Sequence, residues 1–400
     1  MGNDITKSQT TEWDLLKRAA WYAFKLFIAL RVGTLLWMFL LSLTGGRDII
    51  EPNVLCRTSD LLHSAGGLRA WLRWDTVCYL LIAETGYTVN AGLTVWPPFY
   101  PLLIRLFSFV VGTPIAAALL VSSIATWVSF VLLYLLVTEE GHSEETAQNT
   151  LFLYTLYPVA FFLVAGYTES LFLALVLGCL LLARKGKWGW AGLLAALSML
   201  TRNQGIVLSV VLLWEGWLQY GDAHARKVRN IIKVLFAASA PIIVFALLSL
   251  YIRYGLQGGW PWQTLGFLWG QSTGFPWEGI LGNIKLLLTL PTSDDLYWLP
   301  TAILDLTLAI AIPVILVLRR YSMRSTYMIF AWLIVLLGLV KLGPNDVLIS
   351  FSRYMIAVFP FFIITSSIMK NRLARMSVFT FGLLAQAIFM FMFYIWSWAG

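Results

Sequence analysis

An aspartate in the sequence Arg73-Trp74-Asp75 is the first candidate for chemistry in this 400-residue chain. After Asp75, apolar residues recur at helical spacing through Leu81, so the carboxylate stands at the start of a predicted helix. A carboxylate held there can take the proton from an attacking alcohol. The position also suits an ordinary N-cap, because Asp accepts hydrogen bonds from the free N–H groups of a first helical turn. The residues alone leave both interpretations open.

A second acidic candidate, Glu169, lies in the segment 166–170, between two apolar runs with little polar sequence around it. A carboxylate at such a place is costly to bury and needs a polar partner. Either Glu169 binds a ligand, with Tyr167 beside it, or it caps the helix expected from about Ser170.

The segment 201–205, Thr-Arg-Asn-Gln-Gly, interrupts two short apolar runs and carries the basic candidate Arg202. Discontinuous helices expose backbone groups and side chains that bind ligands. Arg202 suits an anionic lipid phosphate. The alternative is an interfacial arginine that extends to the lipid headgroups.

Arg353, followed by Tyr354, is a second basic candidate, at the outer end of a predicted helix. Arginine on that side runs against the usual charge bias of membrane proteins, which favours a phosphate contact over a topological role. Arg73 and Arg105 are further candidates for the same anion.

The patterns of several common enzyme classes are absent from the sequence. It contains no GxGxxG fingerprint, no Walker loop and no HExxH motif. The three histidines, at 63, 142 and 224, support no catalytic triad. Cys56, Cys78 and Cys179 lack metal-ligand spacing, and we expect neither a metal cluster nor a disulfide framework from them. The sequence therefore predicts no metal and no cofactor.

The composition places these candidates in a membrane protein. Hydrophobic residues make up 59 % of the chain, charged residues 12 %, and the mean hydropathy is +0.78. A soluble domain carries about 25 % charged residues. The net charge of +8 is spread over short loops, where Lys and Arg set topology, so no nucleic-acid partner is expected. We expect an all-α polytopic membrane protein with a single domain over residues 1–400.

The basic loops predict how often the chain crosses the membrane. Any two cytoplasmic loops must be separated by an even number of crossings, which requires that one apolar run does not cross. That run is 97–111, because it is short, begins with two prolines and carries Arg105. The count becomes about eleven crossings, with the N-terminus inside. The basic segments expected in the cytoplasm are 17–18, 184–187, 226–233, 319–324 and 370–375.

This topology collects the candidates on the outer side. The first extracytoplasmic loop spans about 44–113 and contains Asp75, and the second large one spans about 254–295. Two further charges, Arg31 and Asp305, fall inside crossings, where they either pair with each other or line a cavity.

Taken together, the motifs resemble the PIG-V family of mannosyltransferases, membrane enzymes of the GT-C class. The resemblance covers about residues 70–215, and at the carboxy-terminal end it is limited to Arg353-Tyr354 with Pro360. It implies a GT-C fold with interfacial helices and an active site in the first extracytoplasmic loop. The matching segments, in family order, are RWDTVCYLLIAETGY, WPPFYPLLIRL, TLYPVAFFLVAGYTESLFLAL and RKGKWGWAGLLAALSMLTRNQGIVL.

The resemblance also implies roles for the candidates. Asp75 matches the family's catalytic base, Glu169 its YTE or YSE glutamate, and Arg202 its Thr-Arg pair. We expect the donor phosphate to contact Arg202, Arg353, Arg73 and Arg105, and the substrates to contact Trp74, Glu169, Tyr167 and Tyr354.

The reaction implied is an inverting transfer of a hexose, most often mannose, from a polyprenyl- or dolichyl-phosphate carrier to a hydroxyl of a glycan or glycolipid. The donor arrives within the membrane lipids, so no nucleotide pocket is needed. Because the chain lacks long inserts, we expect a prokaryotic plasma membrane, the endoplasmic reticulum being the eukaryotic equivalent. Two alternatives stay open: a lipid or glycolipid transporter or flippase, and a non-catalytic transferase subunit in which Asp75 is replaceable.

Overall fold

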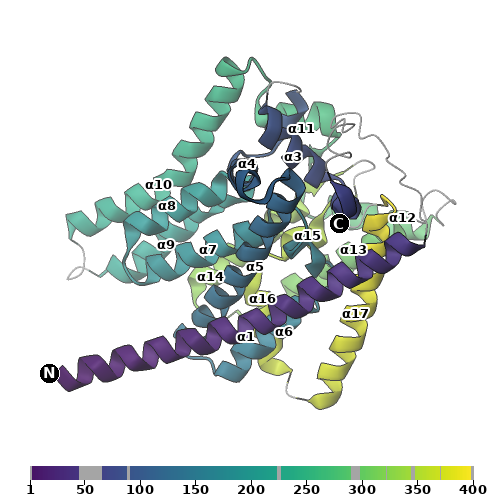
Figure 1. Ribbon diagram of the computed structural model, residues 1–400. Coiled ribbons are helices and arrows are strands. Elements are labelled where there is room, and N and C mark those ends of the chain that lie inside the picture. Colours follow the sequence, from purple (N-terminus) through teal and green to yellow (C-terminus); the bar gives the residue numbers. More distant parts are fainter. Residues whose placement is uncertain are drawn as a thin grey trace.

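The computed structural model describes residues 2–44, 65–87, 91–222, 227–289, 298–320, 322–343, 347–369 and 371–397. This part of the chain is a bundle of helices, with two strands of two residues each (Figure 1). The prediction of an all-α polytopic membrane protein is confirmed. Five helices are long and apolar enough to cross a membrane: α1 (Gly2–Leu43), α5 (Pro114–Glu139), α10 (Val228–Leu250) with its π-helical extension Tyr251–Gly255, α13 (Leu299–Leu318) and α17 (Arg372–Tyr394).

The remaining helices of the bundle are shorter than the roughly 20 residues of a full crossing. Prolines explain two of the breaks. The predicted run 149–166 is not one helix, because α6 ends before the Tyr157-Pro158 pair and the residue before a proline disfavours helical backbone. The run 354–369 is likewise divided just before Pro360. The count of eleven crossings stays a prediction. The shorter helices are α6 (Glu144–Thr155), α7 (Glu169–Arg184), α8 (Trp188–Met199), α9 (Leu208–Tyr220), α14 (Ser325–Leu339) and α16 (Phe359–Ile368).

The segment expected to form the first outer loop folds into short helices. They are η1 (Gly66–Trp71), α3 (Asp75–Thr85), η2 (Ala91–Val95) and α4 (Phe99–Val111). With 13 residues, α4 is about 20 Å long and too short for the roughly 30 Å hydrocarbon core, as expected for the run 97–111.

The two loops expected outside the membrane and the segment that precedes Arg353 contact one another in the structure. Helix α11 (Pro261–Trp269) packs on η2, where the Trp269 indole donates to the carbonyl oxygen of Gly92 at 3.2 Å. Strand β1 (Ser272–Thr273) pairs antiparallel with β2 (Lys341–Leu342). Figure 1 shows α3, α4 and α11 together, away from the N-terminus of α1.

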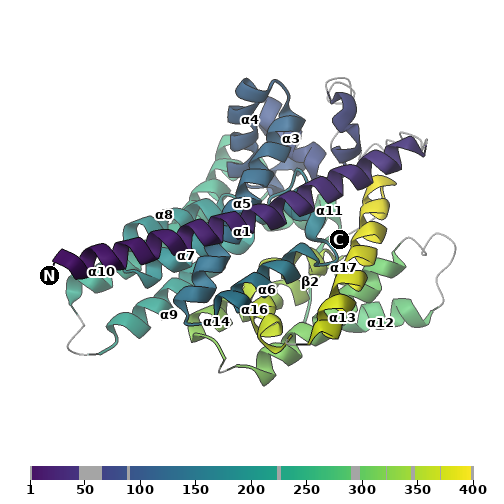
Figure 2. The ribbon, with the colours of Figure 1, turned by 60° about the horizontal axis from the view of Figure 1, so that its bottom comes forward.

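Basic segments expected in the cytoplasm gather at the other end of the molecule, around the turn between α5 and α6 (Figure 2). Arginines from three separate segments pair there with glutamates of that turn, and a fourth pairs with α9. This arrangement is what a shared cytoplasmic side requires. The pairs are Arg18–Glu144 at 3.0 Å, Arg184–Glu140 at 3.4 Å, Arg375–Glu145 at 2.6 Å and Arg324–Glu215 at 2.8 Å.

The structure shows that Arg31 and Asp305 do not pair with each other, because each has partners of its own. Arg31 donates to the carbonyl oxygen of Leu119 at 2.9 Å and to the Ser123 hydroxyl. Asp305 accepts the backbone N–H of Ser352 at 2.8 Å. Both are therefore held by hydrogen bonds to other groups and do not form a pair.

One cysteine prediction was wrong. Cys78 on α3 is disulfide-bonded, whereas Cys179 on α7 is free and buried. Cys56 lies outside the described residues. Pairing depends on which loops the fold brings together, and the spacing of three cysteines carries no such information. A disulfide at Cys78 agrees with an extracytoplasmic location, since disulfides persist in oxidising compartments.

Candidate active site

Four charged side chains from distant segments meet in one chain of ion pairs. Arg353 donates through Nη2 to Asp75 Oδ2 and through Nε to Glu169 Oε1, each at 2.9 Å. Arg202 donates to the same Glu169 oxygen at 2.5 Å. The side chains of Arg353, Glu169 and Arg202 are at most 9 % exposed, whereas Asp75 is 20 % exposed. Asp75 is thus the member that a substrate can reach from outside.

Local backbone strain places Asp75 at the start of α3. Trp74, the residue before it, has φ of 49°, a region that a bulky residue adopts at a cost of about 1–3 kcal/mol. Next to Asp75, Thr76 donates to the carbonyl oxygen of Gly166 at 3.2 Å. A side chain at Gly166 would meet the Thr76 methyl at 2.8 Å, so glycine permits this close approach. The contact joins α3 to the irregular segment before α7.

Glu169 is the first residue of α7 and has one saturated and one unsatisfied oxygen. Oε1 receives both arginines. Oε2 is buried and has no hydrogen-bond partner in the described part of the chain. Buried acceptors of this kind are rare and call for an explanation. Glu169 lines a cavity of about 10 Å³ together with Phe172, Arg202, Gln204, Arg353 and Tyr354. This is room for one water-sized group, so a water or a single hydroxyl group is the size of donor that Oε2 can take there.

The break between α8 and α9 supplies Arg202, as the sequence predicted. Its backbone is extended, and its side chain also donates to the Thr168 hydroxyl at 3.0 Å. Gly205 makes the turn possible, because a Cβ there would lie 2.4 Å from the backbone nitrogen of Met199. Arg202 is turned into the protein and buried, which does not fit a side chain extended to lipid headgroups.

Arg353 belongs to the short helix α15 (Phe351–Met355), whose first turn is held on two sides. The Ser352 N–H is bound by Asp305, and the Ser352 carbonyl oxygen accepts from the Tyr157 hydroxyl at 2.8 Å. The Tyr167 ring centre lies 4.8 Å from the Arg353 guanidinium carbon. Burial alone would lower the pKa of Arg353, but the nearby carboxylates raise it well above its ordinary value, so the group stays charged.

Lys341 is a member of the site that the sequence reasoning missed. It lies on β2, donates to the Tyr354 hydroxyl and sits 4.8 Å from the centre of that ring. Arg202 faces the same ring at 5.3 Å. No ion pair of Lys341 is present among the described residues. One signal was available, since a lysine in an outer loop runs against the positive-inside bias.

Three expected site residues lie at the edge of this cluster or outside it. Arg73 donates to backbone carbonyl oxygens, among them that of Tyr394 at 2.9 Å, and so ties the end of α17 to the residues before α3. Arg105 is exposed on α4. Trp74 adjoins Asp75, with its ring 5.7 Å from that of Trp396.

No group of three or more His, Cys, Asp or Glu residues capable of holding a metal ion occurs in the described ranges. The site instead offers carboxylates for protons and hydroxyls, and cations for an anion. A partly exposed carboxylate beside buried cations suits a reaction in which an alcohol loses its proton while an anionic leaving group departs.

Comparison with known proteins adds a family to this geometry. The family model described as Mannosyltransferase (PIG-V) matches residues 24–259. GPI mannosyltransferase 2 of Yarrowia lipolytica is 35 % identical over 98 residues, which cover 24 % of this chain and 28 % of that protein. GPI alpha-1,6-mannosyltransferase 2 of Rattus norvegicus is 32 % identical over 158 residues, covering 36 % of this chain and 30 % of that protein. The matches thus span less than a third of those relatives. No solved structure matches the chain significantly.

Proposed function

Because the chain belongs to the PIG-V mannosyltransferase family, we propose that it transfers mannose from a polyprenyl- or dolichyl-phosphate carrier to a hydroxyl of a glycan or glycolipid, with inversion at the anomeric carbon. One observation carries the proposal: Arg353 joins the reachable Asp75 to the buried Glu169–Arg202 pair. The base and the cations that the reaction needs therefore lie side by side. The transporter interpretation receives no support from the family match.

The reaction follows from these contacts. The acceptor oxygen forms a bond to the anomeric carbon, and its proton passes to Asp75. The bond from that carbon to the phosphate oxygen breaks, and the electron pair stays on the phosphate. A protonated Asp75 binds Arg353 less strongly, so Arg353 becomes available to the phosphate while its charge develops.

The charges in the site match this donor. Arg202, Arg353 and Lys341 supply three cations, and Asp75 and Glu169 supply two carboxylates, so the cluster carries one net positive charge. A lipid-phosphate sugar is a phosphodiester with one negative charge, which neutralises it. When transfer gives the phosphate a second charge, Asp75 has gained a proton, and the site stays neutral. Lys341 is the cation without a carboxylate partner in the described chain, so it is the first that the phosphate would meet.

Glu169 fits a role in holding the sugar. Its unsatisfied Oε2 is the acceptor that a sugar hydroxyl requires, and it borders the small cavity beside Arg202 and Tyr354. A buried acceptor that two arginines hold in place binds a hydroxyl group more strongly than an acceptor in bulk water does.

The proposed side of the membrane is the extracytoplasmic one. The contacts among the outer segments and the disulfide at Cys78 support it. The proposed membrane is a prokaryotic plasma membrane, or the endoplasmic reticulum in a eukaryotic cell. A Trp262→Cys variant should react with an impermeant thiol reagent from outside, and a Val228→Cys variant should not, although both positions are more than half exposed. The opposite labelling pattern would overturn the orientation.

The decisive experiment supplies the purified protein with polyprenyl-phosphate mannose and candidate glycolipid acceptors. We expect transfer from the lipid-linked sugar and none from the nucleotide sugar alone. Transfer from the nucleotide sugar without a lipid carrier would contradict the proposal. So would a protein that binds the lipid-linked donor but transfers its sugar to none of the acceptors.

A further inference from the structure

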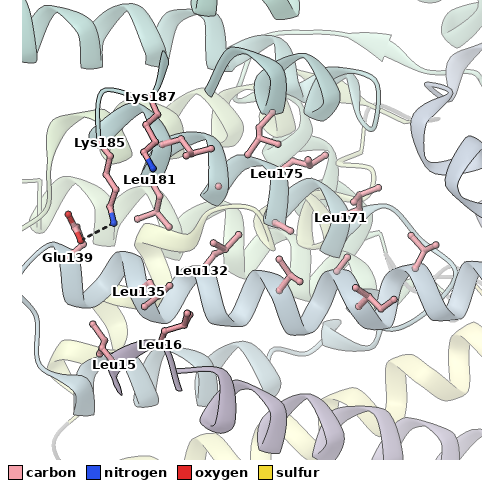
Figure 3. Close-up of a pocket in the computed structure, with 18 of the residues that line it drawn as sticks. Leu15, Leu16, Leu132, Leu135, Glu139, Leu171, Leu175, Leu181, Lys185 and Lys187 are labelled. Atoms are coloured by element: carbon pink, nitrogen blue, oxygen red, sulfur yellow. Dashed lines mark ion pairs between the residues drawn. The ribbon is translucent and has the colours of Figure 1, made fainter. Parts of the chain in front are cut away.

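A long groove separate from the proposed active site runs along α5 and α7, on the side that faces α1 (Figure 3). Its volume is 840 Å³. Apolar side chains form its walls, and Figure 3 shows Leu132 and Leu135 of α5 opposite Leu175 and Leu181 of α7. Its size falls in the range of about 300–1,000 Å³ that is typical of ligand pockets.

Helix α7 separates this groove from the active site. Leu171 and Leu175 line the groove, whereas Glu169 and Phe172 line the small cavity beside the ion pairs. Successive residues of a helix point about 100° apart, so the two sites lie on different faces of α7. The groove and the small cavity are therefore lined by different side chains of α7.

Charged residues line only one end of the groove, and they carry both signs. Figure 3 shows Lys185 and Lys187 at that end, with Glu139 beside them. Lys185 and Glu139 are 4.0 Å apart, and their side chains are 50 % and 43 % exposed. An exposed pair of this kind is weak, so each side chain can exchange its partner for a charged group of a ligand. No ion pair of Lys187 occurs in the described ranges. This end can take a headgroup that contains both an anion and a cation.

The groove's length fits the acyl chain of a lipid seated at that end. From Glu139 back to Val121, the two ends of the groove lining on α5, this helix rises by about 27 Å, which is most of the roughly 30 Å hydrocarbon core. An extended acyl chain that starts at the charged end therefore meets apolar walls along its length. The charged end also contains Glu12 and Trp13 of α1, on the same side as the basic segments gathered there.

We propose that the groove binds one glycerophospholipid with a phosphate and a primary ammonium in its headgroup, as in phosphatidylethanolamine. The phosphate lies between Lys185 and Lys187, the ammonium donates to Glu139, and an acyl chain fills the groove. The lipid joins the first half of α1 to α5 and α7. This inference stands independently of the proposed reaction.

The test measures lipid binding to the delipidated full chain by native mass spectrometry. Phosphatidylethanolamine, phosphatidylcholine and phosphatidylglycerol of equal chain length are added back in turn. Phosphatidylethanolamine should bind best, because phosphatidylcholine has no N–H donor and phosphatidylglycerol has no cation. Equal retention of the three lipids would overturn the proposal.

Two variants locate the site. Lys187→Gln should weaken phosphatidylethanolamine binding about tenfold, the usual effect of losing one charge-assisted hydrogen bond. Lys17→Gln is the matched control, because it removes the same charge at the same end, outside the groove lining. Ala174→Phe should fill the groove and abolish binding while the helical circular dichroism is kept. An equal effect of the control, or full binding to folded Ala174→Phe, would contradict the assignment.

Discussion

Glu169 and Glu215 are both buried and both bind arginine, at opposite ends of the protein, but they differ in how completely they are satisfied. Glu215 uses both oxygens. It accepts two hydrogen bonds from Arg324 at 2.8 Å, one from Thr326 at 2.6 Å and one from Gln219 at 2.7 Å. Such a group needs nothing further, and its contacts join α9 to the start of α14.

Glu169 concentrates its contacts on one oxygen. Arg202 and Arg353 both donate to Oε1, and Oε2 is left without a partner among the described residues. A buried acceptor without a partner costs about 1–3 kcal/mol, which a purely structural pair would avoid. Glu215 is thus satisfied by protein groups alone, whereas Glu169 keeps one oxygen for a further donor, which under our proposal is a hydroxyl group of the substrate.

Asp75→Asn should produce the largest effect among the residues around Glu169. The amide can still accept from Arg353 but cannot take a proton, so transfer should fall about 10²–10⁴-fold. Donor binding and the melting temperature should stay close to wild type. Turnover and thermal unfolding are measured in the same detergent preparation, with Asp14→Asn as an exposed acidic control at the other end. Near-normal turnover of folded Asp75→Asn would remove Asp75 from the mechanism.

Lys341→Met should give the next largest effect, expressed mainly in binding. Losing one charge-assisted contact to the phosphate should raise the KM for the lipid-phosphate donor about tenfold. Inhibition by the free lipid phosphate should weaken at least as much, because that product carries a second negative charge. Lys341→Arg keeps the charge and should restore part of the affinity. Unchanged donor and product affinities in Lys341→Met would show that the phosphate binds elsewhere.

Glu215→Gln should lower the stability of the protein and leave transfer unchanged, which is the reverse of the effect expected for Asp75→Asn. Its amide group would face Arg324 without the charge that holds it, and we expect about 2–3 kcal/mol of lost stability. Turnover per folded molecule should equal wild type. Glu169→Gln in parallel should lose turnover in its folded fraction. If folded Glu215→Gln also lost turnover, the two ends of the protein would be coupled. The contrast between a structural Glu215 and a functional Glu169 would then fail.

Four members of the cluster could be found in the sequence because each is a polar residue that its apolar surroundings leave unexplained. Asp75, Glu169, Arg202 and Arg353 all interrupt or border apolar runs. Lys341 was missed because its position beside Tyr354 depends on the pairing of β1 with β2. These are two short strands with 67 residues between them, and no periodicity reveals their pairing.

Arg73 shows the same limit. Sequence places Arg73 next to the catalytic candidate, but its guanidinium is taken up by backbone carbonyl oxygens of the distant carboxy-terminal segment. For the fold, apolar length predicted the long helices well. It failed around Pro158, where a continuous apolar run is divided into helix, irregular segment and helix. An apolar composition indicates that a segment is buried, either in lipid or in protein. It does not reveal where a helix is interrupted when protein contacts satisfy the backbone groups at the interruption.

Arg375→Gln should have the smallest effect. Arg375 and Glu145 lie 2.6 Å apart, but the two side chains are 38 % and 68 % exposed. Water and salt screen such a pair, and the loss should stay within about 0.5 kcal/mol, smaller still at high salt. A double-mutant cycle with Glu145→Gln, followed by thermal unfolding at low and high salt, measures the coupling. Transfer should not change, because this pair lies at the opposite end of the molecule from Asp75 (Figure 2). A loss of transfer in Arg375→Gln, with stability intact, would show that the inner ion pairs help to set the geometry around Asp75.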